Sequence, residues 1–344
     1  MSKFKLTSRK AAIEIQFNWI FVLIAGSIIF IFIVSLILNQ KKDADIQISQ
    51  DVLKKIATNI RGKQQLTDTI SQLETPSTSF TFSCDVRDLT ADFKISGSQR
   101  EQLSSEIIFA PKEFTTQRIN VWTLDFSIPF IVTRFVYLSP QNMIFLIYNS
   151  TGYENYAAEI YNALPQNITK RYVSSVSEIN SLIKSYNYYR IICFNNCPNT
   201  YKYISILPSS NSESVFGYGI IGYDVIPTNN DQPNNNNRLQ YYLGKASLFG
   251  AIFSDDKKYY TCQMERAFKQ FELKRNLHYQ RILLLESELA SVNPNCVPVL
   301  ALPKSTLLNM KDKSLSDVQT IYQSALSLKN DNTDLIFKGC PLIY

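Results

Sequence analysis

The segment Trp19–Leu38, twenty residues without a charge, constrains the fold of this chain more than any other feature. At a rise of about 1.5 Å per residue, a helix of this length covers about 30 Å, the thickness of the hydrocarbon core of a bilayer. No second apolar run of similar length occurs in the sequence. We therefore expect a single-pass protein in which Trp19, Ile20, Phe21 and Leu38 belong to a membrane anchor, with the lipid bilayer as its partner.

A cleaved secretory signal is the competing explanation for an apolar run near the N-terminus. The hydrophobic core of such a signal has only about 7–15 residues. The residues that follow the run, Asn39–Asp45, also contain no small-x-small cleavage site. The sequence therefore predicts a basic cytoplasmic tail at 1–14 and a permanent transmembrane helix at 15–40.

The distribution of charge and cysteine indicates which side of the membrane each part occupies. Four basic residues precede the span, and fewer follow it closely; an excess of Lys and Arg marks the cytoplasmic side. All six cysteines lie beyond the span, which suits disulfides formed in an oxidising exterior. Glycosylation triplets begin at Asn149 and Asn167. We expect the N-terminus in the cytoplasm and the larger part of the chain outside the cell membrane.

The junction at residues 8–26 reads SRKAAIEIQFNWIFVLIAG. A short basic leader, two alanines, Glu14 and an unbroken apolar helix resemble the class III signal of type IV pilins and archaeal pilin-like proteins. In that family the glutamate is the fifth residue of the mature chain, so the resemblance implies a cut between Arg9 and Lys10. The family has glycine or alanine before the cut, where this chain has Arg9, and we therefore expect the anchor to remain uncleaved.

The resemblance also bears on partners. The same segment is similar to uncharacterised archaeal single-pass proteins with large external domains. In pilins the apolar helices pack into a filament core or anchor the subunit, so the resemblance implies other membrane or surface proteins as partners of the N-terminal helix. Without the resemblance, Glu14 is a carboxylate that extends to the cytoplasmic interface, where its cost is small.

The pattern changes after the anchor. Apolar residues at helical spacing predict a juxtamembrane helical stalk within 41–75, with a break at Gly62. Short runs of β-branched and aromatic residues between polar or proline-marked breaks then predict a β-rich segment at 76–140. We expect the apolar stripe of the stalk to pack on its own domain; pairing with a partner is the alternative.

Residues 141–256 alternate between strand and helix patterns. Strands predicted at 143–149, 171–174 and 189–195 are separated by two amphipathic helices. This order predicts right-handed crossovers and a parallel βαβαβ sheet. The expected fold class is therefore α/β, or α+β when the antiparallel β segments and the other helices are included.

Two features complete the prediction for this domain. Thr151–Glu154 and Ser175–Glu178 have the spacing of capping boxes at the starts of its helices. Two apolar stretches, 214–226 and 238–254, are predicted to be long strands of a hairpin extension, joined by an asparagine-rich loop.

A C-terminal helical segment, 257–344, is expected to pack on the α/β domain. Its first helix, at 257–291, has an apolar seam that Arg275 and His278 interrupt. A capping pair predicts a final helix at Ser314–Lys329. The seam consists of Met264, Phe268, Phe271, Ile282, Leu285 and Leu289.

The six cysteines allow fifteen pairings. Cys193 and Cys197 are close enough in sequence for a local disulfide. Cys262, Cys296 and Cys340 are candidates for bonds between the long helix and the C-terminal segment. The spacings fit neither a Cys-x-x-Cys redox motif nor a zinc cluster, and buried free thiols are the remaining alternative.

The sequence contains no recognisable catalytic motif. His278 is the only histidine, so neither a His-based zinc cluster nor a Ser-His-Asp triad is expected. The net charge is +6, of which the short tail contributes +3; the remainder is too small and too scattered for nucleic acid. We assign no catalytic residue, metal or cofactor.

Two hypotheses of function follow. The leading one is a non-enzymatic, membrane-anchored extracytoplasmic protein, pilin-like at its N-terminus, that binds or assembles with other proteins. The alternative is an anchored hydrolase or transferase with its site at the carboxyl ends of the parallel strands, around Tyr148–Gly152 and Phe194–Cys197. A deep pocket with converging carboxylates at those strand ends would favour the enzyme.

Overall fold

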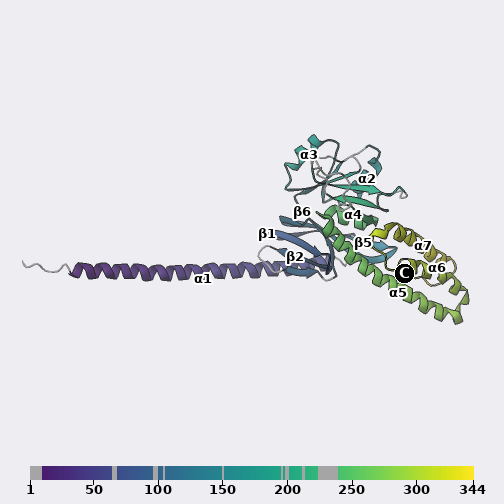
Figure 1. The fold of residues 1–344 in the computed structure, drawn as a ribbon, viewed down its shortest axis with the longest axis horizontal. Helices are drawn as coiled ribbons and strands as arrows, with labels where there is room; N and C mark the ends of the chain where they lie inside the picture. Colours follow the sequence, from purple (N-terminus) through teal and green to yellow (C-terminus); the bar gives the residue numbers. More distant parts are fainter. Residues whose placement is uncertain are drawn as a thin grey trace, which may run out of the picture. The chain divides into compact units, whose positions relative to one another are not determined.

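The structure is a computed structural model with mixed α+β content: one apolar N-terminal helix, two mixed sheets and long C-terminal helices (Figure 1). Contacts divide the chain into two compact units, Met1–Val52 and Leu53–Tyr344. The residues that the structure describes are 10–63, 68–95, 100–103, 105–148, 151–194, 197, 201–210, 214–223 and 239–344.

The first unit is helical. Helix α1 (Lys10–Lys63) begins here and contains the apolar segment Trp19–Leu38, which has a mean hydropathy of 3.1 and is 0% buried. Among the described residues, it is the one segment long and apolar enough to cross a membrane. The predicted anchor residues are well exposed, and apolar surface of this extent is rarely left in water. These residues are Trp19 (71%), Ile20 (53%), Phe21 (71%) and Leu38 (61%).

The pilin-like signal falls partly within the described residues. Lys10 and Glu14 belong to the backbone of α1. Arg9 and the rest of the predicted tail before Lys10 lie outside the described residues.

The second unit begins with the last turns of α1. Ile56, Ala57 and Ile60 are buried there, so this end of the helix packs on its own domain. The helix ends at Lys63, just past Gly62, where the sequence predicted a break.

The prediction of helix up to residue 75 was wrong, because strand β1 (Ile70–Asp85) starts at Ile70. Ile70 and Leu73 pair with Trp122 and Ile119 of the antiparallel neighbour strand instead of continuing a helical stripe.

The first sheet has the order β3-β2-β1-β5-β6-β4. Its neighbours are antiparallel, except that β4 and β6 are parallel. β1 and β5 are long enough, at 16 residues each, to form its centre. The other strands are β2 (Thr90–Ile95), β3 (Arg100–Leu103), β4 (Ile107–Phe109), β5 (Glu113–Ile128) and β6 (Phe130–Pro140).

The second sheet has the order β12-β11-β10-β9-β7-β8. β7 pairs in parallel with β8 and β9, and β9 pairs in parallel with β10. The last two strands are antiparallel. The strands are β7 (Met143–Tyr148), β8 (Thr169–Val173), β9 (Tyr188–Phe194), β10 (Tyr203–Pro208), β11 (Tyr218–Tyr223) and β12 (Leu239–Leu243).

Two helices cover this second sheet. Helix α2 (Glu154–Ala163) contributes Ala157 and Ile160 to the main core, whereas α3 (Val176–Ile183) contributes to a separate cluster with Ile144 and Leu146 of β7. Neighbouring residues of β7 thus supply both clusters, which places the two helices on opposite faces.

The helix caps predicted for this domain differ in outcome. Ser175 caps α3 as predicted, since its side chain accepts a hydrogen bond from the Glu178 amide. The prediction of a cap at Thr151 was wrong: α2 has no side-chain cap, and the Glu154 carboxylate accepts the Gly152 N–H instead.

The long strand predicted at 238–254 was wrong in its second half. Strand β12 ends at Leu243, and helix α4 (Gly244–Phe253) follows at once. Gly244 has a φ of +77°, a conformation that favours glycine and turns the chain out of the strand. Eight of the ten α4 residues are buried, so its sequence has no polar face to reveal the helix. The predicted asparagine-rich loop lies outside the described residues.

Three helices complete the unit. Helix α5 (Lys257–Val292) starts at an Asp256 cap, and the seam residues Met264 and Phe271 are buried on it. Helix α7 (Val318–Phe337) follows a capping box of Ser314 and Asp317 and extends beyond the predicted end at Lys329. Helix α6 (Val297–Asn309) was not predicted, because its sequence contains prolines; one lies at the helix start and Pro303 lies inside it.

Helix α4 lies at the centre of the main core, in contact with β5, β6 and β12. Trp122 of β5 packs edge-on against Phe249 of α4 at 4.8 Å. Tyr137 of β6 donates a hydrogen bond to the Ala246 carbonyl. Glycine at position 250 lets α4 pack closely against Phe109 of β4, since a Cβ there would lie 2.8 Å from the Phe109 ring.

Three disulfides link the second unit. Cys193–Cys197 closes a local loop, as predicted, and Cys296–Cys340 ties α6 to the end of the chain. The expectation that Cys262 bonds to the C-terminal segment was wrong: it bonds to Cys84 of β1, 178 positions away. The reason is that the first turns of α5 pack on β1, with the two Cα atoms 6.0 Å apart.

Candidate functional site

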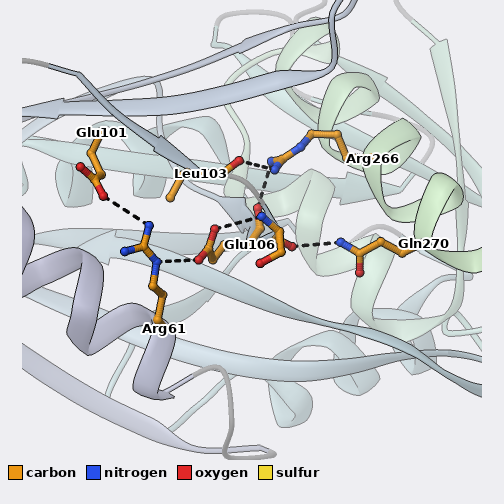
Figure 2. Close-up of polar contacts among 7 residues, drawn as sticks. Arg61, Glu101, Leu103, Glu106, Arg266 and Gln270 are labelled. Carbon is orange, nitrogen blue, oxygen red and sulfur yellow. Dashed lines mark hydrogen bonds and ion pairs between the residues drawn. The ribbon is translucent and has the colours of Figure 1, made fainter.

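A cluster of charged and polar residues joins three distant parts of the second unit (Figure 2). Arg61 comes from the end of α1, Glu101 from β3, Glu106 from the segment before β4, and Arg266 and Gln270 from α5. We call these five residues the Glu106 cluster.

Glu106 is the acidic centre of this cluster. Its side chain is 4% exposed and accepts a hydrogen bond from Arg61 Nε at 2.7 Å. The backbone N–H of Ser105 donates to the other carboxylate oxygen at 3.2 Å. Burial alone would raise the pKa of Glu106, but the Arg61 hydrogen bond, the backbone hydrogen bonds and the nearby positive charge outweigh it and lower this pKa. Glu106 is therefore ionised at neutral pH.

Arg61 is shared between two carboxylates. Its Nη2 lies 3.3 Å from Glu101 Oε1, and the Arg61 side chain as a whole is 43% exposed. The hydrogen bond to Glu106 is the largest cause of the raised pKa of Arg61. The end of α1 is thus held to the β3–β4 segment by side-chain charge.

Side chains of helix α5 bind backbone carbonyl groups of the same β3–β4 segment. Arg266 is 6% exposed and donates to the carbonyl oxygens of Glu106, at 2.9 Å, and Leu103. Gln270 Nε2 donates to the Ser105 carbonyl at 3.0 Å. Burial lowers the pKa of Arg266, yet arginine stays charged at such depths. Its carbonyl partners solvate the charge where water cannot.

A surface pocket of about 540 Å³ lies beside the cluster. Arg134 pairs with Asp125 at 2.6 Å, and Lys274 Nζ donates to the Ile131 carbonyl at 2.9 Å. We call it the basic pocket. It is lined by Arg61, Ser105, Glu106, Ile131, Thr133, Arg134, Gln270 and Lys274.

The lining of the basic pocket suits binding rather than bond making. Ser105 and Thr133 offer hydroxyl groups, but a hydroxyl nucleophile needs a base to take its proton. The carboxylate of this lining, Glu106, has a lowered pKa and is engaged by Arg61, which makes it a poor base. The pocket therefore presents fixed charges and hydrogen-bond donors without an activated nucleophile.

His278 occupies a packing position. Its Nδ1 lies 3.1 Å from the Ile343 carbonyl oxygen, and its ring lies 4.5 Å from that of Phe130. Burial is the main cause of its lowered pKa, and the positive charges of Arg281 and Lys274 act in the same direction. This histidine joins α5 to the last residues of the chain.

The strand ends named in the enzymatic hypothesis are partly outside the described residues, at positions 149, 150, 195 and 196. In the described part, Phe194 is buried and stacks on Tyr153 at 5.9 Å. Cys197 is bonded to Cys193, and Glu154 accepts from Gly152. These side chains are occupied by packing and by local bonds, and the hydrolase or transferase hypothesis stays a prediction.

Sequence reasoning missed the Glu106 cluster. Of its members, only Arg266 left a signal, since it falls among Met264, Ala267 and Phe268 on the buried side of α5, and a charge on an apolar face needs a partner. Glu106 and Arg61 are 45 positions apart, and nothing in either local sequence indicates the pairing.

Within the described part of the chain, no group of three or more His, Cys, Asp or Glu residues is arranged to hold a metal ion. No protein-family model, no curated protein and no solved structure matches this chain.

Proposed function

We propose that this chain is a membrane-anchored protein whose larger unit folds outside the cytoplasm and has a binding or assembly role without catalysis. The observation that carries the proposal is the helical segment Trp19–Leu38, which contains no charged residue, has a mean hydropathy of 3.1 and is 0% buried. Such a surface is stable when lipid surrounds it. The three disulfides of the second unit support an oxidising compartment for that unit.

The proposal extends to the N-terminal helix and to the fold. We propose that the segment around Glu14 pairs with other membrane proteins in a pilin-like manner, as its sequence suggests. We also propose that β7 to β9, with α2 and α3, form a right-handed βαβαβ unit. The parallel pairing of these strands and the placement of the two helices in different clusters support this arrangement.

Membrane fractionation tests the anchor. Full-length protein should sediment with membranes, resist an alkaline carbonate wash and dissolve in detergent. A variant with Ile29→Lys and Ile33→Lys should leave the membrane, because each lysine at a helix centre costs about 2.5–3.5 kcal/mol. Ile29→Leu with Ile33→Leu is the matched control and should behave as the natural chain does. Full-length protein in the soluble fraction would exclude an anchor.

Cysteine labelling tests the orientation. Ser2→Cys places a thiol in the tail, and Val292→Cys places one at a position that is 82% exposed in the second unit. A membrane-impermeant maleimide should modify Val292→Cys in intact cells and Ser2→Cys only after lysis. The reverse pattern would show that the larger unit is cytoplasmic. N-terminal sequencing of the extracted protein distinguishes an intact anchor from a pilin-type cut before Lys10.

A further inference from the structure

A second surface pocket, of about 750 Å³, has a different character from the basic pocket and shares no lining residue with it. Its walls come from β1, from the start of β5, from the turn between β6 and β7, and from the start of β9. We call it the amide pocket. It is lined by Ser77, Thr115, Thr116, Gln117, Arg118, Gln141, Asn142, Asn187 and Tyr188.

The amide pocket is nearly neutral. Arg118 is the charged member of this lining, and its guanidinium pairs with Glu74 at 3.3 Å. An anionic ligand would therefore gain little here. The lining also contains no aliphatic side chain larger than that of threonine, whereas pockets for apolar ligands are lined mainly by hydrophobic residues.

The walls of the pocket are held in place by the protein itself. Tyr188 Oη accepts a hydrogen bond from the Thr115 amide at 2.8 Å, which links the two sheets. The backbone N–H of Gln141 donates to the Arg118 carbonyl oxygen at 3.0 Å, and Thr116 Oγ1 donates to the same oxygen at 2.8 Å. A ligand thus meets a preformed surface, which reduces the entropy lost on binding.

The side chains on these walls keep hydrogen-bonding capacity for a ligand. Gln117, Gln141 and Asn187 are exposed, and each amide offers both donors and an acceptor. Asn142 Oδ1 is buried and has no hydrogen-bond partner among the described residues, a condition that costs about 1–3 kcal/mol. Because that oxygen is shielded from solvent, the exposed amides of Gln117, Gln141 and Asn187 are the groups that a ligand contacts.

Hydroxyl groups are the chemical partners that match this lining, because each one donates and accepts at the same time. We infer that the amide pocket binds a neutral saccharide of a few sugar units, with Gln117, Gln141 and Asn187 contacting its hydroxyl groups. A pocket of this volume lies within the range of about 300–1,000 Å³ that small-ligand sites occupy. This inference names a ligand for the proposed binding role and rests on the larger unit lying outside the cytoplasm.

Binding to the natural full-length protein tests the inference. The protein is placed in lipid nanodiscs without glycoside detergents, which would compete for the site. The probes are maltotriose, mannotriose and N,N′,N″-triacetylchitotriose, each followed by saturation-transfer NMR and by calorimetry. At least one should bind, and trigalacturonate should bind no better than the neutral probes. Failure of all three neutral probes, or preference for the acidic one, would overturn the inference.

Two sets of substitutions locate the site. Gln117→Ala, Gln141→Ala and Asn187→Ala together remove exposed side chains and should weaken binding at least about tenfold, as expected for several lost hydrogen bonds. Asn276→Ala, Gln280→Ala and Gln319→Ala together, at exposed amide side chains outside both pockets, are the matched control and should leave the affinity unchanged. Equal affinity in the triple variant would place the ligand elsewhere. Fractionation of the cells from which each variant is extracted reports separately on the proposed function, because it measures sedimentation with membranes and not saccharide binding.

Discussion

The Arg61–Glu106 ion pair offers the sharpest test of how the end of α1 is fastened. We predict that Arg61→Met lowers the free energy of unfolding of the second unit by about 2 kcal/mol. The substitution keeps the length and helical propensity of the side chain, but it leaves the Glu106 carboxylate without its charged donor. Glu106 is 4% exposed, so water has little access to replace that donor.

The magnitude follows from the unequal exposure of the two partners. Breaking a fully buried pair costs about 3–5 kcal/mol, and breaking an exposed pair costs about 0–1 kcal/mol. Here the Arg61 side chain is 43% exposed, while the Glu106 side chain is 4% exposed. Glu106 also keeps the hydrogen bond from the Ser105 amide at 3.2 Å. An intermediate loss is therefore expected, in the range of about 1.5–3 kcal/mol found for hydrogen bonds to charged groups.

Tryptophan fluorescence provides the assay. The chain has two tryptophans; Trp19 lies in the apolar segment of α1, and Trp122 is 2% exposed in the core of the second unit. In a Trp19→Phe background, denaturant unfolding of full-length protein in nanodiscs then reports on the second unit through Trp122. Arg87→Met is the matched control, since Arg87 is 89% exposed and lies 3.4 Å from Asp85. It should change the unfolding free energy by less than about 0.5 kcal/mol.

A double-mutant cycle decides between loss of the pair and loss of packing. In a Glu106→Gln background, Arg61→Met should cost at least about 1 kcal/mol less than in the natural chain, because no buried charge remains to be stranded. If Arg61→Met costs the same in both backgrounds, or no more than Arg87→Met, the ion pair does not fasten the helix.

Three other predictions concern closure of the chain, close packing and acid. Serine substitution of both cysteines should lower the free energy of unfolding by about 5 kcal/mol for Cys84–Cys262 and by about 2 kcal/mol for Cys193–Cys197. The two losses differ because the closed loops differ in length, with separations of 178 and 4 residues. Equal losses in calorimetry would contradict loop entropy as the cause. In chemical denaturation, Gly219→Ala should lower the free energy of unfolding by more than about 2 kcal/mol, because its Cβ would lie 2.4 Å from the Leu207 carbonyl oxygen. Gly222→Ala on the same strand is the control. Its Cβ would meet atoms no closer than 3.6 Å, so its effect on the unfolding free energy should be small. Folding lowers the pKa of Glu106. Its contribution to stability should therefore be fully present above the ordinary glutamate pKa of about 4.3 and be lost as the pH falls through the lowered value. Glu106→Gln should flatten the acid limb of a stability–pH curve, and an unchanged limb would exclude Glu106 as a cause of the acid-induced loss of stability.

Elements that depend on local sequence could be predicted well. The helix at Trp19–Leu38 follows from composition alone, and α5 begins at an Asp256 cap and ends at Val292, next to the predicted end at residue 291. The cap of α3 by Ser175 is equally local. In each case the signal lies within a few residues of the element it specifies, so no knowledge of the tertiary fold is needed.

Elements whose conformation depends on tertiary surroundings could not be predicted in this way. Helix α4 is buried among strands of both sheets, so its sequence lacks the polar face that marks an amphipathic helix. The last part of the predicted stalk, Ile70–Leu73, had apolar spacing that fitted a helix, but pairing with β5 made it a strand. In both segments a partner far along the chain decides the structure.

The same distinction explains the candidate sites. The local pair Cys193–Cys197 was predicted, whereas Cys84–Cys262 joins residues that only the packing of α5 on β1 brings together. The amide pocket also combines four separate segments, each of which is an ordinary polar turn or strand end in the sequence. No single segment contains enough of the lining residues for its sequence to predict the pocket.

The Cys84–Cys262 disulfide has a consequence for a protein exposed to proteases. Every strand of the second sheet, from β7 to β12, lies in the sequence between these two cysteines. One cut anywhere in that interval leaves two polypeptides, but the sulfur bridge still tethers the distal piece to the piece that includes α1. Release of the distal piece after a single cut therefore requires reduction of the Cys84–Cys262 disulfide as well as proteolysis. Until that disulfide is reduced, the two pieces of a nicked molecule stay covalently joined.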